Sequence, residues 1–490
     1  MIQTPAAVQP EMKRELGLLD STMIVAGSMI GSGIFLVSSD IAKSVGSPFY
    51  ILLIWLITGV ITLIAALSYG ELAGMMPKAG GQYVYLREAY NPMVGFLFGW
   101  TVFTVIQTGV IAAVAIAFAT YASELIPWFS KTNILLKIGF FEFNATQFLA
   151  VVLIAFLTYV NLQGVKNAKV LQTVFTLAKI LALIGLIVLG IYFGLNSEAF
   201  SQNMANFWTP FVTTVQPNGT ISTEMLGGTV LWAAVGAAMV GSLFSSDSWN
   251  NITYTAGEIK NPQRNIPLSL FLGTLIVTIL YILANVAYLM ILPVAGAPDG
   301  VGVFERGIMF ATENRVGTAA ASMIFGTAAA TIMALLIMVS TFGCNNGMIL
   351  SGARLYHTMA QDGVFFKKAG TLNSKGVPAF ALYIQAGWAS LLCLSGTFGQ
   401  LLDYCTFSSL LFYVVTIIGL FILRYTRPDA DRPYKAFGYP ILPALYILLA
   451  GAICIILLVE KPGTCGWGLA IVLLGLPVYY IWKWANNRKS

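Results

Sequence analysis

Two stretches of small and polar residues interrupt apolar runs at matching places in the chain. The first reads Gly27-Ser28-Met29-Ile30-Gly31-Ser32-Gly33, and the second reads Gly241-Ser242-Leu243-Phe244-Ser245-Ser246-Asp247. Each opens with Gly-Ser, continues with two large apolar residues and ends with three small or polar ones. Small residues in tandem destabilise a helix and let a ligand come close to the backbone. Both stretches are therefore predicted to be unwound.

The exposed backbone of an unwound stretch has a specific chemistry. Free N–H groups at the start of the following half-helix lie at the positive end of its dipole, and they suit a carboxylate. Carbonyl groups at the end of the preceding half-helix suit an ammonium. A small zwitterion satisfies both kinds of group. The alternative for the first stretch is close helix packing, because Gly27 and Gly31 also form a GxxxG pattern.

Two charged residues lie deep inside apolar runs. Lys179 lies in the middle of Thr176–Leu181, and a charge at such a depth needs a partner. Asp247 has two interpretations: it contacts a ligand, or it is a structural acid hydrogen-bonded to Ser245, Ser248 or a backbone amide. The chain holds one histidine and no cluster of acids or cysteines, so neither catalysis, a metal nor a cofactor is predicted.

The composition shows which elements must position these residues. Of the 490 residues, 58% are hydrophobic and only 9% are charged, against a charged share of roughly 25% in soluble domains. So apolar a chain could not cover a soluble surface, which excludes a soluble enzyme and a nucleic-acid-binding protein. The five cysteines show no CxxC pattern, so a disulfide framework is not expected. The fold class predicted is an all-α polytopic membrane protein.

Twelve segments are apolar enough to span a bilayer, which takes about 20 residues. They are 18–45, 48–72, 93–124, 145–162, 170–194, 228–256, 266–293, 318–350, 378–396, 400–423, 441–460 and 466–484. If the N-terminus is cytoplasmic, only six of the 26 lysines and arginines face outward (Lys43, Lys131, Lys137, Arg306, Arg315 and Lys461). Lys179 lies within a span, so nineteen remain inside. This asymmetry predicts that both termini are cytoplasmic.

The two interrupted segments are the first and sixth spans, five spans apart. A pair of glycine-interrupted spans in corresponding halves is typical of a transporter with inverted repeats and a substrate site at the midplane of the membrane. The spacing thus predicts which two helices form the site.

Several motifs resemble those of the L-type amino acid transporters of the amino acid–polyamine–organocation superfamily. The similar stretches are Gly27–Phe35, Tyr69–Leu72, Pro77–Tyr83, Leu243–Asn250, Glu258–Pro267, Phe342–Gly347 and Arg354-Leu355. They cover nearly the whole chain in the same order. The resemblance implies the LeuT-like fold, with two inverted five-helix repeats, two further helices and alternating access. The implied boundaries are a tail 1–17, a first repeat 18–194, an outer loop 195–227, a second repeat 228–423, two further spans within 424–484 and a tail 485–490.

The resemblance also implies roles for single residues. Substrate would be bound by residues of the first and sixth spans: Met29, Ile30, Gly31, Ser32, Gly33, Phe244, Ser245, Ser246 and Asp247. Phe244 is similar to an aromatic gate, and Asn250 would hold the sixth helix open. Lys179 is similar to a lysine whose ammonium stands where relatives bind sodium, which implies sodium-independent transport.

The function implied is exchange of small neutral L-amino acids such as serine, threonine or alanine, because small polar residues surround the glycines. Three alternatives stay open: a proton-coupled symporter, an exchanger of cationic amino acids or cystine, and, more distantly, a membrane amino acid sensor. Animal members join a glycoprotein through a cysteine after the third span, but Glu124–Thr146 contains none. A bacterial, stand-alone member in the inner membrane is therefore expected, with no disulfide-linked partner.

Acidic and basic residues gather near the cytoplasmic ends of the predicted spans. Glu71, Glu88 and Glu258 lie near lysines and arginines, and they could form either a gate of ion pairs or ordinary solvated pairs. His357, at the end of the eighth span, is predicted to lie in solvent.

Overall fold

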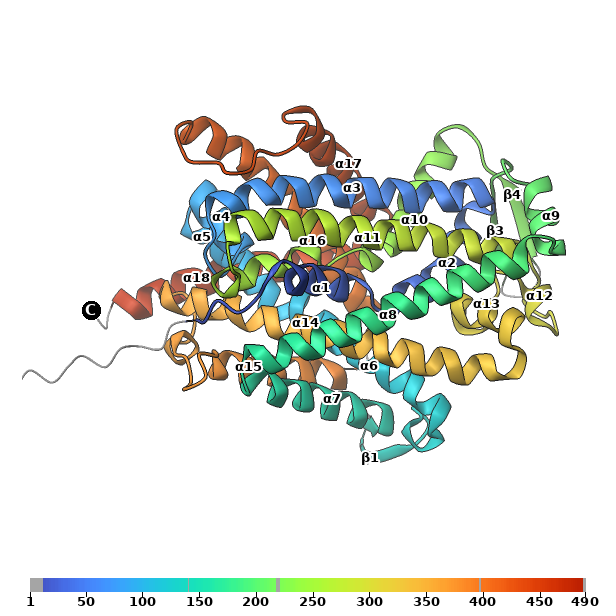
Figure 1. Ribbon diagram of the computed structural model, residues 1–490, viewed down its shortest axis with the longest axis horizontal. Coiled ribbons are helices and arrows are strands. Elements are labelled where there is room, and N and C mark those ends of the chain that lie inside the picture. The colour runs from blue at the N-terminus through green and yellow to red at the C-terminus, as the bar shows by residue number, and fades with distance from the viewer. Residues whose placement is uncertain (1–11, 140, 217–220, 396–397, 488–490) are drawn as a thin grey trace, which may run out of the picture.

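Long helices run side by side along the main axis of the molecule (Figure 1). The computed structural model describes residues 12–139, 141–216, 221–395 and 398–487. Most of the predicted tail 1–17, the end of the tail 485–490, part of the loop 195–227 and the last residue of the span 378–396 lie outside these ranges.

Ten helical stretches of the described chain are long and apolar enough to cross a membrane. Three of them are interrupted by a π-helical turn or a 3₁₀ segment, written η. They are α3 (Pro48–Met75), α5-η2-α6 (Pro92–Thr101, Val102–Ile106, Gln107–Leu125), α7 (Ala145–Leu162), α8 (Val165–Gly194), α10-η4 (Gly228–Ser245, Trp249–Glu258), α11 (Pro262–Ile291), α13-η6-α14 (Val316–Phe325, Gly326–Ala328, Ala329–Gln361), α16 (Phe398–Thr426), α17 (Ile441–Glu460) and α18 (Pro462–Asn487). The chain is therefore a multi-pass membrane protein.

The remaining two predicted spans are helical but shorter. The first is divided into α1 (Leu18–Met29), η1 (Gly33–Phe35) and α2 (Val37–Val45), and the ninth is the 16-residue helix α15 (Ala379–Leu394). Every predicted segment thus coincides with helical structure. Dividing the first segment leaves helices of 12 and 9 residues, each shorter than the roughly 20 that a single straight span needs.

Short elements connect the long helices at both ends of the bundle. They are α4 (Gln82–Ala89), η3 (Pro127–Phe129), β1 (Ile134–Ile138), β2 (Phe141–Asn144), α9 (Glu198–Ala205), β3 (Phe211–Val215), β4 (Ile221–Met225), α12 (Val303–Arg306), η5 (Thr312–Asn314) and η7 (Lys367–Gly370). The strands form two antiparallel hairpins, β1–β2 and β3–β4. We call the end with α9 and α12 the outer end and the end with α4 and η7 the inner end (right and left in Figure 1), following the predicted orientation.

The two interrupted helices lie side by side and run in opposite directions. α1 packs against η4, whereas α2 packs against α10. The first half of each helix therefore contacts the second half of the other. Helices α8, α11 and α14 all contact α1 and support its broken end. This arrangement brings the two breaks together in the interior of the bundle.

Candidate functional site

The first helix breaks where the sequence predicts it. α1 ends at Met29, and Ile30 has an extended backbone with ψ of 97°. Helical structure resumes at Gly33. A break of this kind leaves carbonyl groups on one side and N–H groups on the other without helical partners.

Side chains from helices α8 and α14 bind the carbonyl groups of this break. The Lys179 ammonium on α8 donates to the carbonyls of Gly27 and Ile30, each at 2.6 Å, and to that of Ser340 at 3.3 Å. The Ser340 hydroxyl on α14 lies 3.1 Å from the Ile30 carbonyl oxygen and 3.0 Å from that of Gly31. Lys179 is 1% exposed, and no ion pair within the described chain includes it. The partner predicted for this buried charge is thus a set of backbone carbonyls.

The N–H groups on the other side of the first break have no such partners. Across the described residues, no hydrogen bond uses the backbone N–H of Gly31, Ser32 or Gly33. The buried hydroxyl of Ser28 also lacks a partner there. Unpaired donors at this depth are costly unless a ligand or water meets them. This side of the break is therefore suited to an anionic group.

The sixth helix breaks after Ser245, and an acid stands at the break. Ser248 has a left-handed backbone with φ of +69°, and helical structure resumes at Trp249. The Tyr413 hydroxyl on α16 lies 2.5 Å from Asp247 Oδ1 and 3.1 Å from Asn250 Oδ1. The Asn250 amide in turn donates to Gln82 Oε1 at 2.9 Å. A network of side chains from η4, α16 and α4 thus fixes the second break.

The two breaks touch each other. A Cβ atom on Gly33 would lie 2.2 Å from the Ser245 hydroxyl, so only glycine fits at this position. The Tyr281 hydroxyl on α11 lies 3.1 Å from the carbonyl oxygens of both Met29 and Ser245. This single hydroxyl joins the last residues of α1 and α10.

A cavity of about 690 Å³ extends from the two breaks to the outer end of the bundle. Ser28, Gly31 and Ser245 line its deep part, and Lys131, Glu313 and Arg315 are among the charged residues that line it toward the outer end. A cavity of this size is typical of a small-molecule site, for which roughly 300–1,000 Å³ is usual. The breaks are therefore accessible from the outer end.

Most of the predicted substrate-binding residues line this cavity. Seven of them do so: Met29, Gly31, Ser32, Gly33, Phe244, Ser245 and Asp247. Ile30 and Ser246 do not: Ile30 is 1% exposed, and Ser246 lines a separate, smaller pocket beside Trp249 and Tyr446. Lys179 and Asn250 do not line this cavity: Lys179 binds the carbonyls of the first break, and Asn250 is hydrogen-bonded to Gln82 and Tyr413 beside the second.

Three contributors to the site were not predicted from the sequence: Tyr281, Ser340 and Tyr413. Each is a polar residue in the middle of an apolar helix, and that is the signal that could have found them. Their partners lie between 36 and 310 positions away in the chain. Only the packing of the helices brings them to the breaks.

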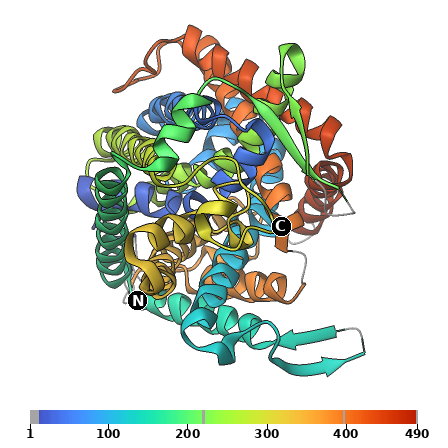
Figure 2. The same ribbon diagram turned by 90° about the vertical axis from the view of Figure 1, so that its right-hand side faces the viewer.

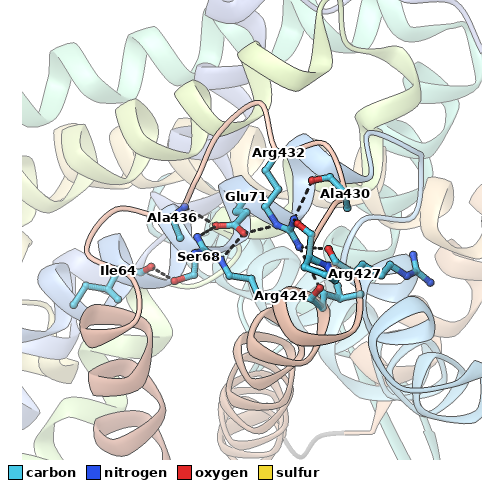
Figure 3. Close-up of polar contacts among 10 residues, drawn as sticks. Ile64, Ser68, Glu71, Arg424, Arg427, Ala430, Arg432 and Ala436 are labelled. Atoms are coloured by element: carbon cyan, nitrogen blue, oxygen red, sulfur yellow. Dashed lines mark hydrogen bonds and ion pairs between the residues drawn. The ribbon is translucent and has the colours of Figure 1, made fainter.

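The inner end, unlike the outer end, is closed by buried ion pairs. Arg354 on α14 lies 3.0 Å from Glu258, and both side chains are 0% exposed. Glu71, also 0% exposed, accepts hydrogen bonds from Arg424 at 2.9 and 2.6 Å and from the Ala436 N–H at 2.7 Å, with Arg432 3.2 Å away (Figure 3). Ordinary solvated pairs are thus the wrong interpretation for Glu71 and Glu258.

The single histidine of the chain, His357, is buried and not exposed to solvent as predicted. His357 is 3% exposed, and its Nδ1 lies 3.0 Å from the Ala369 carbonyl oxygen. It was predicted to lie in solvent, but the segment Lys367–Gly370 folds back over the end of α14 and covers it.

Pairs nearer the inner surface remain partly exposed. Glu88 lies 2.8 Å from Arg427 and 3.1 Å from Arg87, which lowers the pKa of its carboxyl below the ordinary value, mainly through the hydrogen bond from Arg427. Burial raises the pKa of Tyr90, next to this pair, to about 12.

The chain is similar in sequence to a family of membrane transport proteins. The amino acid permease family matches residues 16–480. The chain is 30% identical over 472 residues to the large neutral amino acids transporter small subunit 2 of Mus musculus, covering 96% of this chain and 81% of that protein. It is 30% identical to the serine/threonine exchanger SteT of Bacillus subtilis (strain 168), covering 96% and 97%. It is 29% identical to the b(0,+)-type amino acid transporter 1 of Mus musculus, covering 97% and 90%.

Proposed function

Because the chain belongs to the amino acid permease family, we propose that it exchanges small neutral L-amino acids across a membrane, without sodium and by alternating access. The observation that carries this proposal is the outer cavity, which ends at two adjacent helix breaks with free N–H groups on Gly31, Ser32 and Gly33. The SteT relative is named as a serine/threonine exchanger, which agrees with a small polar substrate.

The substrate's two charged groups would bind at different breaks. Its carboxylate would accept hydrogen bonds from the N–H groups at the first break, where the half-helix dipole favours an anion. Its ammonium would face the second break, where Asp247 and the Ser245 carbonyl provide acceptors. Each carbonyl oxygen has two lone pairs, so the Ser245 carbonyl can accept a second hydrogen bond beside that of Tyr281.

The deep walls of the cavity favour a small side chain. Ser28, Gly31 and Ser245 contribute little volume, whereas Phe244 and Met348 project larger side chains into the same space. Lys179 supports the absence of sodium coupling, because its ammonium already takes the carbonyls of Gly27 and Ile30 that a cation would need.

The architecture that we propose has twelve spans in two inverted five-helix repeats, 18–194 and 228–423, followed by two more spans within 424–484. The antiparallel contacts of α1 with η4 and of α2 with α10 support the inversion. We further propose that both termini are cytoplasmic, in a bacterial inner membrane. The five cysteine side chains are buried, which supports a chain that works without a disulfide-linked partner.

A second candidate function is exchange of cationic amino acids or cystine. The observation that favours it is the carboxylate of Asp247, which lines the cavity and has no basic partner within the described residues. A cationic side chain could bind there directly. The two candidates differ in whether arginine competes with serine.

Reconstituted vesicles test both candidates. Uptake of labelled serine should require an amino acid trapped inside and should not change when sodium is removed. Alanine and threonine should compete, and arginine should not. Competition by arginine or cystine would favour the second candidate. Accumulation in empty vesicles driven only by an inward pH gradient would instead show a proton-coupled symporter, and binding without any uptake would show a sensor.

A further inference from the structure

The β1–β2 hairpin between α6 and α7 has one apolar face and one charged face. Beyond a register shift near its start, Leu136 pairs with Phe143, and Lys137 pairs with Glu142. Residues two apart in a strand share a face, and cross-strand partners share it too. Leu136, Ile138 and Phe143 therefore lie on one face, and the Lys137–Glu142 ion pair lies on the other.

The apolar face of this hairpin is not covered by the rest of the chain. Leu136 is 49% exposed and Ile138 is 64% exposed. An isolated two-stranded hairpin is only marginally stable in water, and exposed apolar patches mark contact surfaces. This face therefore requires a cover that the described chain does not supply.

The apolar face continues into the lipid-facing side of α7. Phe148, Val152, Phe156 and Tyr159 are exposed along one stripe of this membrane-spanning helix. The Phe143 ring, on the apolar face of the hairpin, contacts the Phe148 ring at the start of that stripe, with 6.5 Å between centroids. The apolar face is thus directed along α7, toward the bilayer, and the charged face is directed away from the bilayer.

The position of the hairpin agrees with this direction. It lies at the outer end of α7 in Figure 1, and it projects sideways beyond the helices in Figure 2, where the view is along them. Trp128, which is 51% exposed and also contacts Phe148, lies beside it. Tryptophan is enriched at the level of the lipid headgroups.

We propose that the β1–β2 hairpin lies on the outer surface of the bilayer, with Leu136 and Ile138 inserted at the boundary between headgroups and acyl chains. Lys137 and Glu142 face water or phosphate groups. Amphipathic segments bind in this way, with the apolar face at the headgroup boundary. The hairpin then fixes the loop between α6 and α7 at the membrane surface, beside the mouth of the cavity.

Fluorescent labelling in vesicles tests the proposal. Ile138→Cys and Lys137→Cys place an environment-sensitive dye at neighbouring positions on opposite faces. In phosphatidylcholine–phosphatidylglycerol vesicles, the dye at 138 should be quenched several-fold more strongly than that at 137 by a spin label on the lipid chain near the headgroup, with a blue-shifted emission. Aqueous iodide should show the reverse order. The chain without an added cysteine gives the background, because Cys344 lines the cavity.

Two results would overturn the proposal. Equal iodide quenching at 137 and 138 would mean that both faces are in water. Protection of 138 from both quenchers, with disulfide dimers of Ile138→Cys on oxidation, would mean that a second copy covers the face. Leu136→Cys repeats the measurement on the same face in case the first variant does not fold, and it should behave as Ile138→Cys does.

Discussion

Side chains of opposite charge lie at the two helix breaks. At the first, the ammonium of Lys179 and the hydroxyl of Ser340 bind the carbonyls, and the N–H groups of Gly31–Gly33 remain free. At the second, the carboxylate of Asp247 is held by Tyr413 and faces the cavity. At the first break, the protein therefore binds the carbonyl groups itself and leaves the N–H groups free, whereas at the second break a side-chain carboxylate faces the cavity. In the proposed site, the first break would bind the substrate's carboxylate and the second its ammonium.

Removing the cation at the first break should have the largest effect. In Lys179→Met, the Gly27 carbonyl loses its side-chain donor, and the Ile30 carbonyl keeps only the hydroxyl of Ser340. Each buried acceptor left unpaired costs about 1–3 kcal/mol. We therefore expect serine exchange to fall by more than about tenfold, since 1.4 kcal/mol corresponds to a factor of ten. Vesicle exchange and the melting temperature measure the loss.

Lys169 on the same helix is the matched control for this variant. Its ammonium pairs with Asp20 at 3.2 Å and is partly exposed. Lys169→Met should therefore change exchange only slightly, because exposed pairs contribute about 0.2–1 kcal/mol. If Lys179→Met exchanged serine at the same rate as Lys169→Met does, the carbonyls of the first break would not need a donor. The role given to Lys179 at this break would then be wrong.

Filling the space between the two breaks with a methyl group should have the next largest effect, a loss of stability. Gly33→Ala places a Cβ atom 2.2 Å from the Ser245 hydroxyl, whereas Gly31→Ala places one 3.7 Å from Cys344 Sγ, which is ordinary contact. Overpacking of this kind costs about 1–3 kcal/mol. Gly33→Ala should lower the melting temperature by several degrees, and Gly31→Ala should not.

A compensating change isolates the contact between the breaks. Ser245→Gly removes the two side-chain atoms nearest to the added methyl group. In the double variant Gly33→Ala with Ser245→Gly, most of the lost melting temperature should return. No recovery would mean that the backbone of Gly33, rather than its contact with Ser245, requires glycine.

Neutralising the acid at the second break should have a smaller effect than removing Lys179. Asn at position 247 keeps an oxygen for the Tyr413 hydroxyl, but a hydrogen bond to a charged group is stronger than a neutral one by about 1 kcal/mol. We expect Asp247→Asn to weaken serine binding about fivefold at most. Titration of binding by intrinsic fluorescence measures it, with Tyr413→Phe as the control that removes the donor and keeps the acid. A tighter complex with serine in Asp247→Asn would show that the charge opposes a neutral substrate.

The sequence predicts the breaks better than it predicts what holds them. Tandem small residues have a local effect on helix stability, so both break positions could be read from the chain, and the structure confirms them at Ile30 and Ser246. The length of the apolar runs likewise located every long helix, because the thickness of the bilayer sets the same minimum length for each span.

The groups that bind the breaks depend instead on which helices pack together. The partners of Lys179 lie about 150 positions away, and those of Ser340 about 310. A buried lysine predicts that a partner exists but not that it is a pair of carbonyls. Glu71 and Glu258 show the same limit: ion pairs at helix ends are commonly solvated, and only the fold of the inner end buries these two.

Removing a charge outside the membrane-spanning helices should change stability least. It shows how much a partly exposed ion pair contributes, against which the variants at the two breaks can be compared. The folded pKa of Glu88 is lowered by Arg427 and Arg87, so the folded state favours its carboxylate. That stabilisation is present above the ordinary pKa of 4.5 and is lost as the pH falls through the lower folded value. Glu88→Gln should therefore lower the free energy of unfolding by about 0.2–1 kcal/mol at neutral pH, and its melting temperature slightly. Both differences should vanish in acid. Melting curves of both chains across this range measure it. A loss of melting temperature at neutral pH as large as that of Lys179→Met would mean that burial in the membrane does not determine how much a charged group stabilises this protein.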